Sequence, residues 1–220
     1  MLVMPLDPWR EAAITAALAV YVLAVIFATS LLYSLMRNRG ISEESARYYN
    51  RKIIHALGGG VVALLVPVLY SSPLFLLLAT TLLGTFLLLA RRYRIMKWFQ
   101  TEDNAYEVNF VLAWGLSVFL LWNLLKDPMV AVVPALFISF GDAATGFVRN
   151  FLFSRRTKHW IGNVAMGLVC VPMGFLFAGT AGAAAGLLAS IVERFEFGYI
   201  DDNVLITLVT TLVIIFFESV

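Results

Sequence analysis

Two adjacent acids stand at the edge of an apolar segment near the end of the chain, in the tetrapeptide Ile200-Asp201-Asp202-Asn203. The apolar run that follows, 204–217, would place them at the headgroup level of a bilayer. Ionisable groups held at a membrane are candidates for a functional site, and carboxylate oxygens suit a hard cation such as Mg²⁺. We expect a split, in which one acid binds metal and the other residue caps the last helix. The alternative is a solvated turn in which Asp202 or Asn203 caps the last helix.

A third acid, Asp142, lies inside an otherwise apolar stretch, which a solvated loop does not explain. Gly141 and Gly146 flank it and would let a phosphate or another helix come close. The alternative is a helix-packing patch in which Asp142 pairs with an arginine. Because acids are rare within membranes, the pattern favours a functional role.

Two basic segments could hold an anion. In Arg51-Lys52-Ile53-Ile54-His55, at the predicted start of a helix, the histidine lies one turn after the arginine. In the segment 155–163, Lys158 precedes the free N–H groups of a predicted helix start, where polyphosphate could bind. The alternatives are a snorkelling basic belt for the first segment and an interfacial anchor at Trp160 for the second.

Other polar residues stand at predicted helix ends. Glu193 precedes the last loop, and Asn104, Glu107 and Asn109 enter the fourth predicted helix. They could contact a hydroxyl or a metal-bound water, although capping explains the latter three more simply. The chain has no zinc-ligand spacing, Walker loop, dinucleotide fingerprint or Ser-His-Asp order.

The elements that must position these residues are membrane helices. Of the 220 residues, 61% are hydrophobic, which is typical of a polytopic membrane protein. We predict an all-α transmembrane bundle of about seven to eight helices in one domain, 1–220, whose first helix is peripheral and too long for a signal peptide. Gly182 and Gly186 are spaced for close helix packing, Pro172 could kink its helix, and the single Cys170 excludes an intrachain disulfide. The predicted helices are 12–36, 53–70, 73–90, 108–125, 128–147, 160–178, 180–193 and 204–219.

Charge predicts the orientation of the bundle. If all eight helices span, 14 of the 16 basic residues fall on one side, which the positive-inside rule assigns to the cytoplasm. Every polar cluster named above lies on that same side. We therefore expect a multi-pass protein of the cell membrane with its site on the cytoplasmic face and both termini outside.

Four motifs, taken in order, resemble the CTP-dependent polyprenol kinase family, which includes dolichol kinase, phytol kinase and the yeast-type CTP-dependent diacylglycerol kinase. The resemblance covers about 51–220, and the Gly-Asp and Lys-x-x-x-Gly pieces are also similar to those of phosphatidate cytidylyltransferases and CDP-archaeol synthase. The chain departs from the family at Ile161, where members usually carry Glu, and near Arg149, where they usually carry Gly. The motifs are Arg51-Lys52-x-x-His55 with Gly58-Gly59-Gly60, Gly141-Asp142-Ala143-Ala144, Lys158-x-Trp160-x-Gly162-Asn163 and Ile200-Asp201-Asp202-Asn203.

The resemblance implies transfer of the γ-phosphoryl group of CTP to an isoprenoid alcohol with Mg²⁺ as cofactor. The expected partners are CTP, a lipid alcohol and membrane lipids, with no nucleic acid. Two alternatives stay open: a CTP-dependent cytidylyltransferase that makes a CDP-lipid, and a small-solute transporter. The implied residues are Asp201, Asp202, His55 and Lys158 for catalysis, Asp142, Asp201 and Asp202 for metal, and Arg51, Lys52, Gly141, Gly146, Arg156, Lys158, Gly162 and Asn163 for nucleotide.

Overall fold

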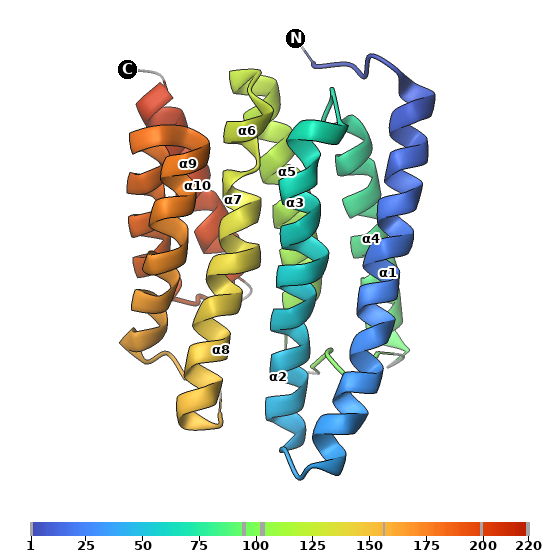
Figure 1. The fold of residues 1–220 in the computed structure, drawn as a ribbon, viewed down its shortest axis with the longest axis vertical. Coiled ribbons are helices and arrows are strands. Elements are labelled where there is room, and N and C mark those ends of the chain that lie inside the picture. The colour runs from blue at the N-terminus through green and yellow to red at the C-terminus, as the bar shows by residue number, and fades with distance from the viewer. Residues whose placement is uncertain (1, 94–95, 102–103, 156, 199, 219–220) are drawn as a thin grey trace.

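The computed structural model describes residues 2–93, 96–101, 104–155, 157–198 and 200–218, and its regular elements within these ranges are all helical. The helices run roughly parallel to one axis and form a bundle (Figure 1). In chain order they are α1 (Pro8–Asn38), α2 (Glu43–Ile53), η1 (Ile54–Gly60), α3 (Val61–Leu69), α4 (Leu74–Arg92), α5 (Tyr106–Leu125), α6 (Pro128–Ala131), α7 (Val133–Leu136), η2 (Phe137–Gly141), α8 (Asp142–Phe153), α9 (Trp160–Val192) and α10 (Asp202–Glu218).

Within the described ranges, six helical segments are long and apolar enough to cross a membrane. This supports the predicted helical membrane bundle, with a count below the seven to eight expected. The difference lies at the C-terminal end. There α9 counts as one segment although it contains a sharp bend, and α10, with 17 residues, is at the lower limit for a spanning helix and is not among the six. The six segments are Pro8–Asn38, Glu43–Leu69, Leu74–Arg92, Tyr106–Leu125, Pro128–Phe153 and Trp160–Val192.

The bend in α9 comes from small residues. Its backbone leaves helical geometry at Ala178 and Gly179, and the φ of +55° at Gly179 is one that L side chains rarely adopt. On either side of the bend the backbones of Gly174 and Gly182 meet, with no room for a side chain between them. The chain therefore folds back on itself at Gly179, as the predicted break between 178 and 180 indicated.

Two π-helical segments interrupt the helices that carry the predicted motifs. The second predicted helix begins at Glu43, ten residues earlier than expected, so Arg51 and Lys52 lie in the last turn of α2 just before η1. Asp142, expected near a helix end, is instead the first residue of α8 directly after η2. Such π segments often mark functional sites, and here the two face each other.

Glycines allow this close approach of η1 and η2. A Cβ on Gly59 would meet Phe110 and the Ser139 hydroxyl, and one on Gly60 would meet the Phe140 ring. The glycine run after His55 thus brings the histidine-bearing segment against the segment that leads into Asp142.

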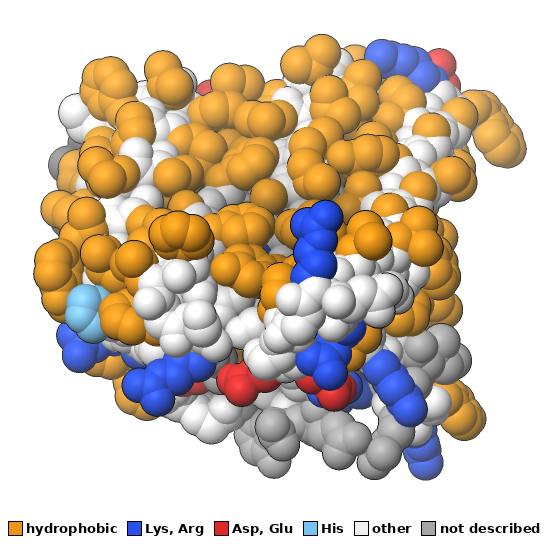
Figure 2. All heavy atoms as spheres, turned by 60° about the horizontal axis from the view of Figure 1, so that its bottom comes forward, with side chains coloured by type: hydrophobic (Ala, Val, Ile, Leu, Met, Phe, Trp, Pro, Cys, Tyr) orange, Lys and Arg blue, Asp and Glu red, His pale blue; other side chains and the backbone are white. Residues whose placement is uncertain are grey.

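Polarity divides the bundle along its length. Apolar side chains cover most of the face in Figure 2, and acidic and basic groups gather toward the end that lies at the bottom of Figure 1. Helix α1 runs along the right-hand edge in Figure 1, and only 11% of its most apolar stretch is buried inside the bundle. This agrees with its predicted peripheral place.

Candidate metal and phosphate site

Asp142 is the centre of a buried charged cluster between α2, η1 and α8. Lys52 Nζ donates to both carboxylate oxygens, at 2.5 Å to Oδ1 and 2.6 Å to Oδ2. His55 Nδ1 lies 3.0 Å from Oδ2, and its ring stacks on Phe110 with centroids 3.8 Å apart. Because an ionised carboxylate only accepts hydrogen bonds, Nδ1 is the protonated nitrogen and Nε2 of His55 is left as an acceptor.

Gly146 makes room for the lysine in this cluster. A Cβ at Gly146 would overlap the aliphatic stem of Lys52, which crosses the surface of α8 at that point. Only 1% of Asp142 and 6% of Lys52 is exposed, so the pair is shielded from solvent. Removing one charge would leave the other buried and uncompensated, which is strongly destabilising.

A second cluster joins α8 to the two ends of α9. Arg149 grips Glu193 through two hydrogen bonds, from Nη1 to Oε1 at 2.7 Å and from Nη2 to Oε2 at 2.9 Å. The same guanidinium donates to Asn163 Oδ1 at 3.0 Å and packs against Gly162, where any Cβ would collide with it. Gly162 and Asn163 thus lie at the candidate site, where they accommodate and orient an arginine.

Lys158 links this second cluster to the start of α10 through ion pairs. Its Nζ lies 2.8 Å from Asp202 Oδ2, 3.3 Å from Glu193 Oε1 and 3.0 Å from Glu196 Oε1. Burial favours the neutral amine, but the charges of Asp202 and Glu193 outweigh it and raise the pKa of Lys158 above its ordinary value. Lys158 is therefore a fixed cation at neutral pH.

Three carboxylates from the two clusters converge. One oxygen each from Asp142, Glu193 and Asp202 lies within 4.8 Å of the others, and all three residues are buried. They come from α8, the end of α9 and the start of α10, so the fold brings together acids separated by up to 60 positions. An all-oxygen set of buried acids fits a hard divalent cation such as Mg²⁺.

The other acid of the pair, Asp201, points elsewhere. Its Oδ1 accepts from the backbone N–H of Val204 at 3.2 Å, as an N-cap does, and its Oδ2 accepts from Asn109 at 3.1 Å and Asn203 at 3.4 Å. Burial and the neighbouring charge of Asp202 raise the pKa of Asp201 to about 6. Among the described residues, Asp201 stands outside the converging group. It caps α10, in place of Asp202 or Asn203, the two caps that the sequence suggested.

The remaining candidates have different places. Asn104 bonds locally, its Oδ1 accepting from Ala105 N at 2.7 Å. Glu107 is 5% exposed and lies 3.7 Å from Arg91, away from the three converging acids. Gly141 packs against Cys170, where a Cβ would not fit. Arg156 lies outside the described residues.

Between the clusters lies a polar cavity of about 20 Å³, room for little more than one water molecule. It is small because the acids and cations are paired with one another. A polyphosphate would enter only as the cations exchange carboxylate for phosphate partners. The walls are Tyr48, Arg51, Lys52, His55, Tyr106, Arg149, Thr157, Lys158, Asp202 and Asn203.

Arg149 and Tyr48 belong to this site although the motifs did not point to them. Arg149 is seven residues after Asp142, two turns along the same helix face, and that spacing could have indicated it. Tyr48 lies four residues before Lys52, whose ammonium is 5.2 Å from the centre of the Tyr48 ring.

Comparisons of the chain with protein-family models, with curated protein sequences and with solved structures find no match.

Proposed function

We propose that this chain is a multi-pass membrane kinase that transfers the γ-phosphoryl group of CTP to an isoprenoid alcohol at the cytoplasmic face of the cell membrane. The observation that carries the proposal is the interleaving of three buried carboxylates with three cations at one end of an apolar bundle. Phosphoryl transfer needs mainly positioning and charge stabilisation, which such a set supplies. The preference for CTP and for an isoprenoid rests on the four-motif resemblance.

The acids and the cations have separate tasks in this proposal. Asp142, Glu193 and Asp202 would hold Mg²⁺, which when bound neutralises charge on the phosphate oxygens. Lys52, Lys158 and Arg149, which pair with these acids in the structure, would turn from carboxylates to phosphate oxygens. Glu193 then takes the place of the acid that the family usually carries where this chain has Ile161.

His55 is the best-placed proton acceptor. Its Nδ1 is held by Asp142, and the side chain lines the polar cavity as well as an apolar cavity beside it. The alcohol oxygen forms a bond to the γ-phosphorus, the bond from that phosphorus to the β–γ bridging oxygen breaks, and CDP leaves. The hydroxyl proton passes to Nε2 of His55. Asp201 is less suited to this role because both of its oxygens already accept hydrogen bonds.

The proposal is tested by an assay of the purified protein in lipid nanodiscs with Mg²⁺, four nucleoside triphosphates and a panel of prenols of increasing length. We expect a prenyl monophosphate and CDP, with CTP the preferred donor. Formation of pyrophosphate without CDP would instead identify a cytidylyltransferase. The matched variants are Asp202→Asn, in the converging group, and Asp201→Asn, its neighbour in sequence outside it.

A further inference from the structure

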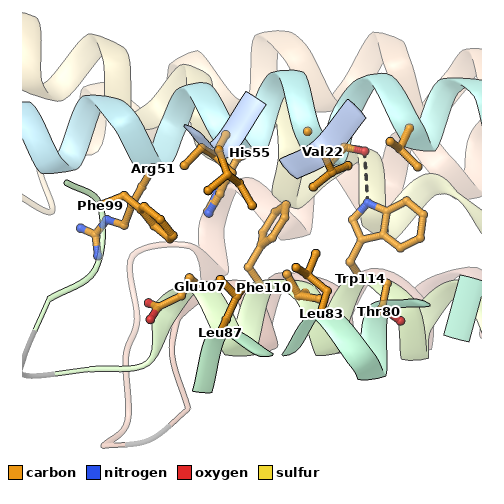
Figure 3. A pocket seen from close by; sticks show the side chains of 16 residues that line it. Val22, Arg51, His55, Thr80, Leu83, Leu87, Phe99, Glu107, Phe110 and Trp114 are labelled. Atoms are coloured by element: carbon orange, nitrogen blue, oxygen red, sulfur yellow. Dashed lines mark hydrogen bonds between the residues drawn. The ribbon is translucent and has the colours of Figure 1, made fainter. Parts of the chain in front are cut away.

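An apolar cavity of about 90 Å³ lies beside the polar site, between α1, η1, α4 and α5. Figure 3 shows its two ends: Arg51, Phe99 and Glu107 lie at one end, with His55 nearer that end than Trp114 and Thr80, which lie at the other. Arg51 and His55 line both this cavity and the polar one. The apolar space therefore begins where the proposed phosphoryl transfer would occur.

A second and larger apolar cavity, about 490 Å³, adjoins the first. The two share five wall residues, among them Thr80 and Trp114 at the far end of the first cavity. The second runs on along α1 to Ala12 and along α3 to Tyr70. From Ile26 to Ala12, α1 rises roughly 21 Å at about 1.5 Å per residue, so the two adjoining cavities, taken together as the joined cavity, extend over about that length of α1.

The side chains that line the two apolar cavities indicate which kind of molecule could bind there. In the far part of the joined cavities the polar side chains are already bonded: Thr80 Oγ1 donates to Leu76 O at 2.9 Å, and Thr15 Oγ1 and Tyr70 Oη lie 2.8 Å apart. Trp114 Nε1 donates to Gly59 O at 3.3 Å. These walls favour a hydrocarbon occupant, because a polar group would find no free hydrogen-bond partner there.

The end near the polar site differs. Glu107 is 5% exposed, and neither of its carboxylate oxygens has a hydrogen-bond partner among the described residues. Its ion-pair partner, Arg91 Nη1, lies 3.7 Å from Oε1, beyond hydrogen-bond distance. A buried acceptor without a hydrogen-bond donor is costly, and a hydroxyl group would supply that donor. The cavity thus has one hydroxyl-binding end and one long apolar body.

We infer that this joined cavity binds the lipid alcohol, with its hydroxyl at Glu107 and His55 and its single hydrocarbon chain running between α1, α3 and α4 toward Tyr70. The inference rests on the proposed function for the identity of the alcohol and adds the place and orientation of its binding. Glu107 is a substrate-binding residue in this arrangement, and the cavity length sets the preferred chain length.

The first test blocks the far part of the cavity. Ala79 of α4 lines the second cavity, and Ala79→Trp would fill it, whereas Thr81 two residues away is exposed and lines neither cavity. We expect Ala79→Trp to lower the ratio of kcat/KM for a long prenol to that for a short prenol at least 10-fold, and Thr81→Trp to leave that ratio as in the wild type. Equal ratios in both variants would overturn the inference and leave the kinase proposal standing.

The second test examines the hydroxyl end. Glu107→Gln should raise KM for the alcohol about 10-fold or more and leave KM for CTP unchanged, because a charge-assisted hydrogen bond is lost at the alcohol alone. Parallel rises in both KM values would contradict the assignment.

The third test does not require turnover. A prenol with a diazirine at its far end, added without nucleotide, should label peptides of α1 and α4 that line the second cavity, with labelling reduced in Ala79→Trp. Labelling confined to other helices would overturn the inference. If the wild type phosphorylates no alcohol yet shows the expected labelling, the proposed function fails and the binding site stands.

Discussion

At the scale of single residues, two neighbouring acids have different partners. Asp202 meets Lys158 and lies among the converging carboxylates, whereas Asp201 accepts hydrogen bonds from Val204 and Asn109. Adjacent residues at a helix start point in different directions, so one can cap while the other faces the bundle. A division between a metal-binding acid and a capping residue could be predicted from the sequence, but the predicted caps were Asp202 and Asn203 and the cap is Asp201. The outcome depends on which way α10 turns its first residue.

Asp202→Asn should lower kcat on the order of 100-fold, because one of the three carboxylates proposed to hold Mg²⁺ is lost. Asp201→Asn should retain most of the activity, since an amide oxygen can still cap α10. Steady-state rates and Mg²⁺ titrations of the two variants check this. Equal losses in both, with similar unfolding temperatures, would remove the distinction between them.

The pKa of Asp201, raised to about 6 from its ordinary 3.8, predicts a pH dependence of stability. The folded state holds this proton more tightly than the unfolded chain, so the contribution is fully present below pH 3.8 and is lost as pH rises through 6. Without divalent cations, the unfolding temperature of the wild type should therefore fall between pH 4 and 7 relative to that of Asp201→Asn. Parallel profiles for the two proteins would show that Asp201 does not titrate in this range.

At the scale of helices, glycines determine where two helical segments can pack closely. The apolar runs and the break at Gly179 could be predicted from the sequence, since hydrophobic length and a small-residue turn are local properties. The π segments η1 and η2 could not, because they depend on contacts such as that of Gly60 with Phe140. The spacing from Asp142 could have indicated Arg149, but its pairing with Glu193 could not be predicted, because Glu193 lies more than forty residues later in the chain.

Gly174→Ala should destabilise the fold of α9, because its Cβ would meet the backbone of Gly182, which cannot move aside as a side chain can. Overpacking of this kind costs about 1–3 kcal/mol. Gly167→Ala in the same helix is the control, since its nearest neighbour, Ser190 Oγ, would lie at an ordinary 3.5 Å. Thermal unfolding in detergent should show a lower midpoint for the first variant only. A midpoint unchanged in Gly174→Ala would contradict the close contact.

At the scale of the whole molecule, charge and apolarity divide the bundle into a charged end and an apolar body (Figure 2). The positive-inside rule predicts that the charged end faces the cytoplasm. A site at that end can receive a charged nucleotide from the cytosol and a lipid from the membrane. A transporter would be expected to hold its polar groups near the bilayer midplane, with access to both sides.

The orientation is tested by cysteine labelling. The native Cys170 is fully buried, so an impermeant maleimide should report mainly on added cysteines. Arg155→Cys should react only from the cytoplasmic side and Lys126→Cys, in the turn between α5 and α6, only from the outside. Reaction of both from one side would contradict the predicted topology.

The most direct test of the central claim uses CTP that carries ³²P in the γ-phosphate and ³H in the cytosine, with Mg²⁺ and a prenol. A kinase places ³²P on the lipid and leaves ³H in soluble CDP, and the Asp202→Asn variant should do so far more slowly. Recovery of ³H in the lipid, or of ³²P in pyrophosphate, would contradict the account.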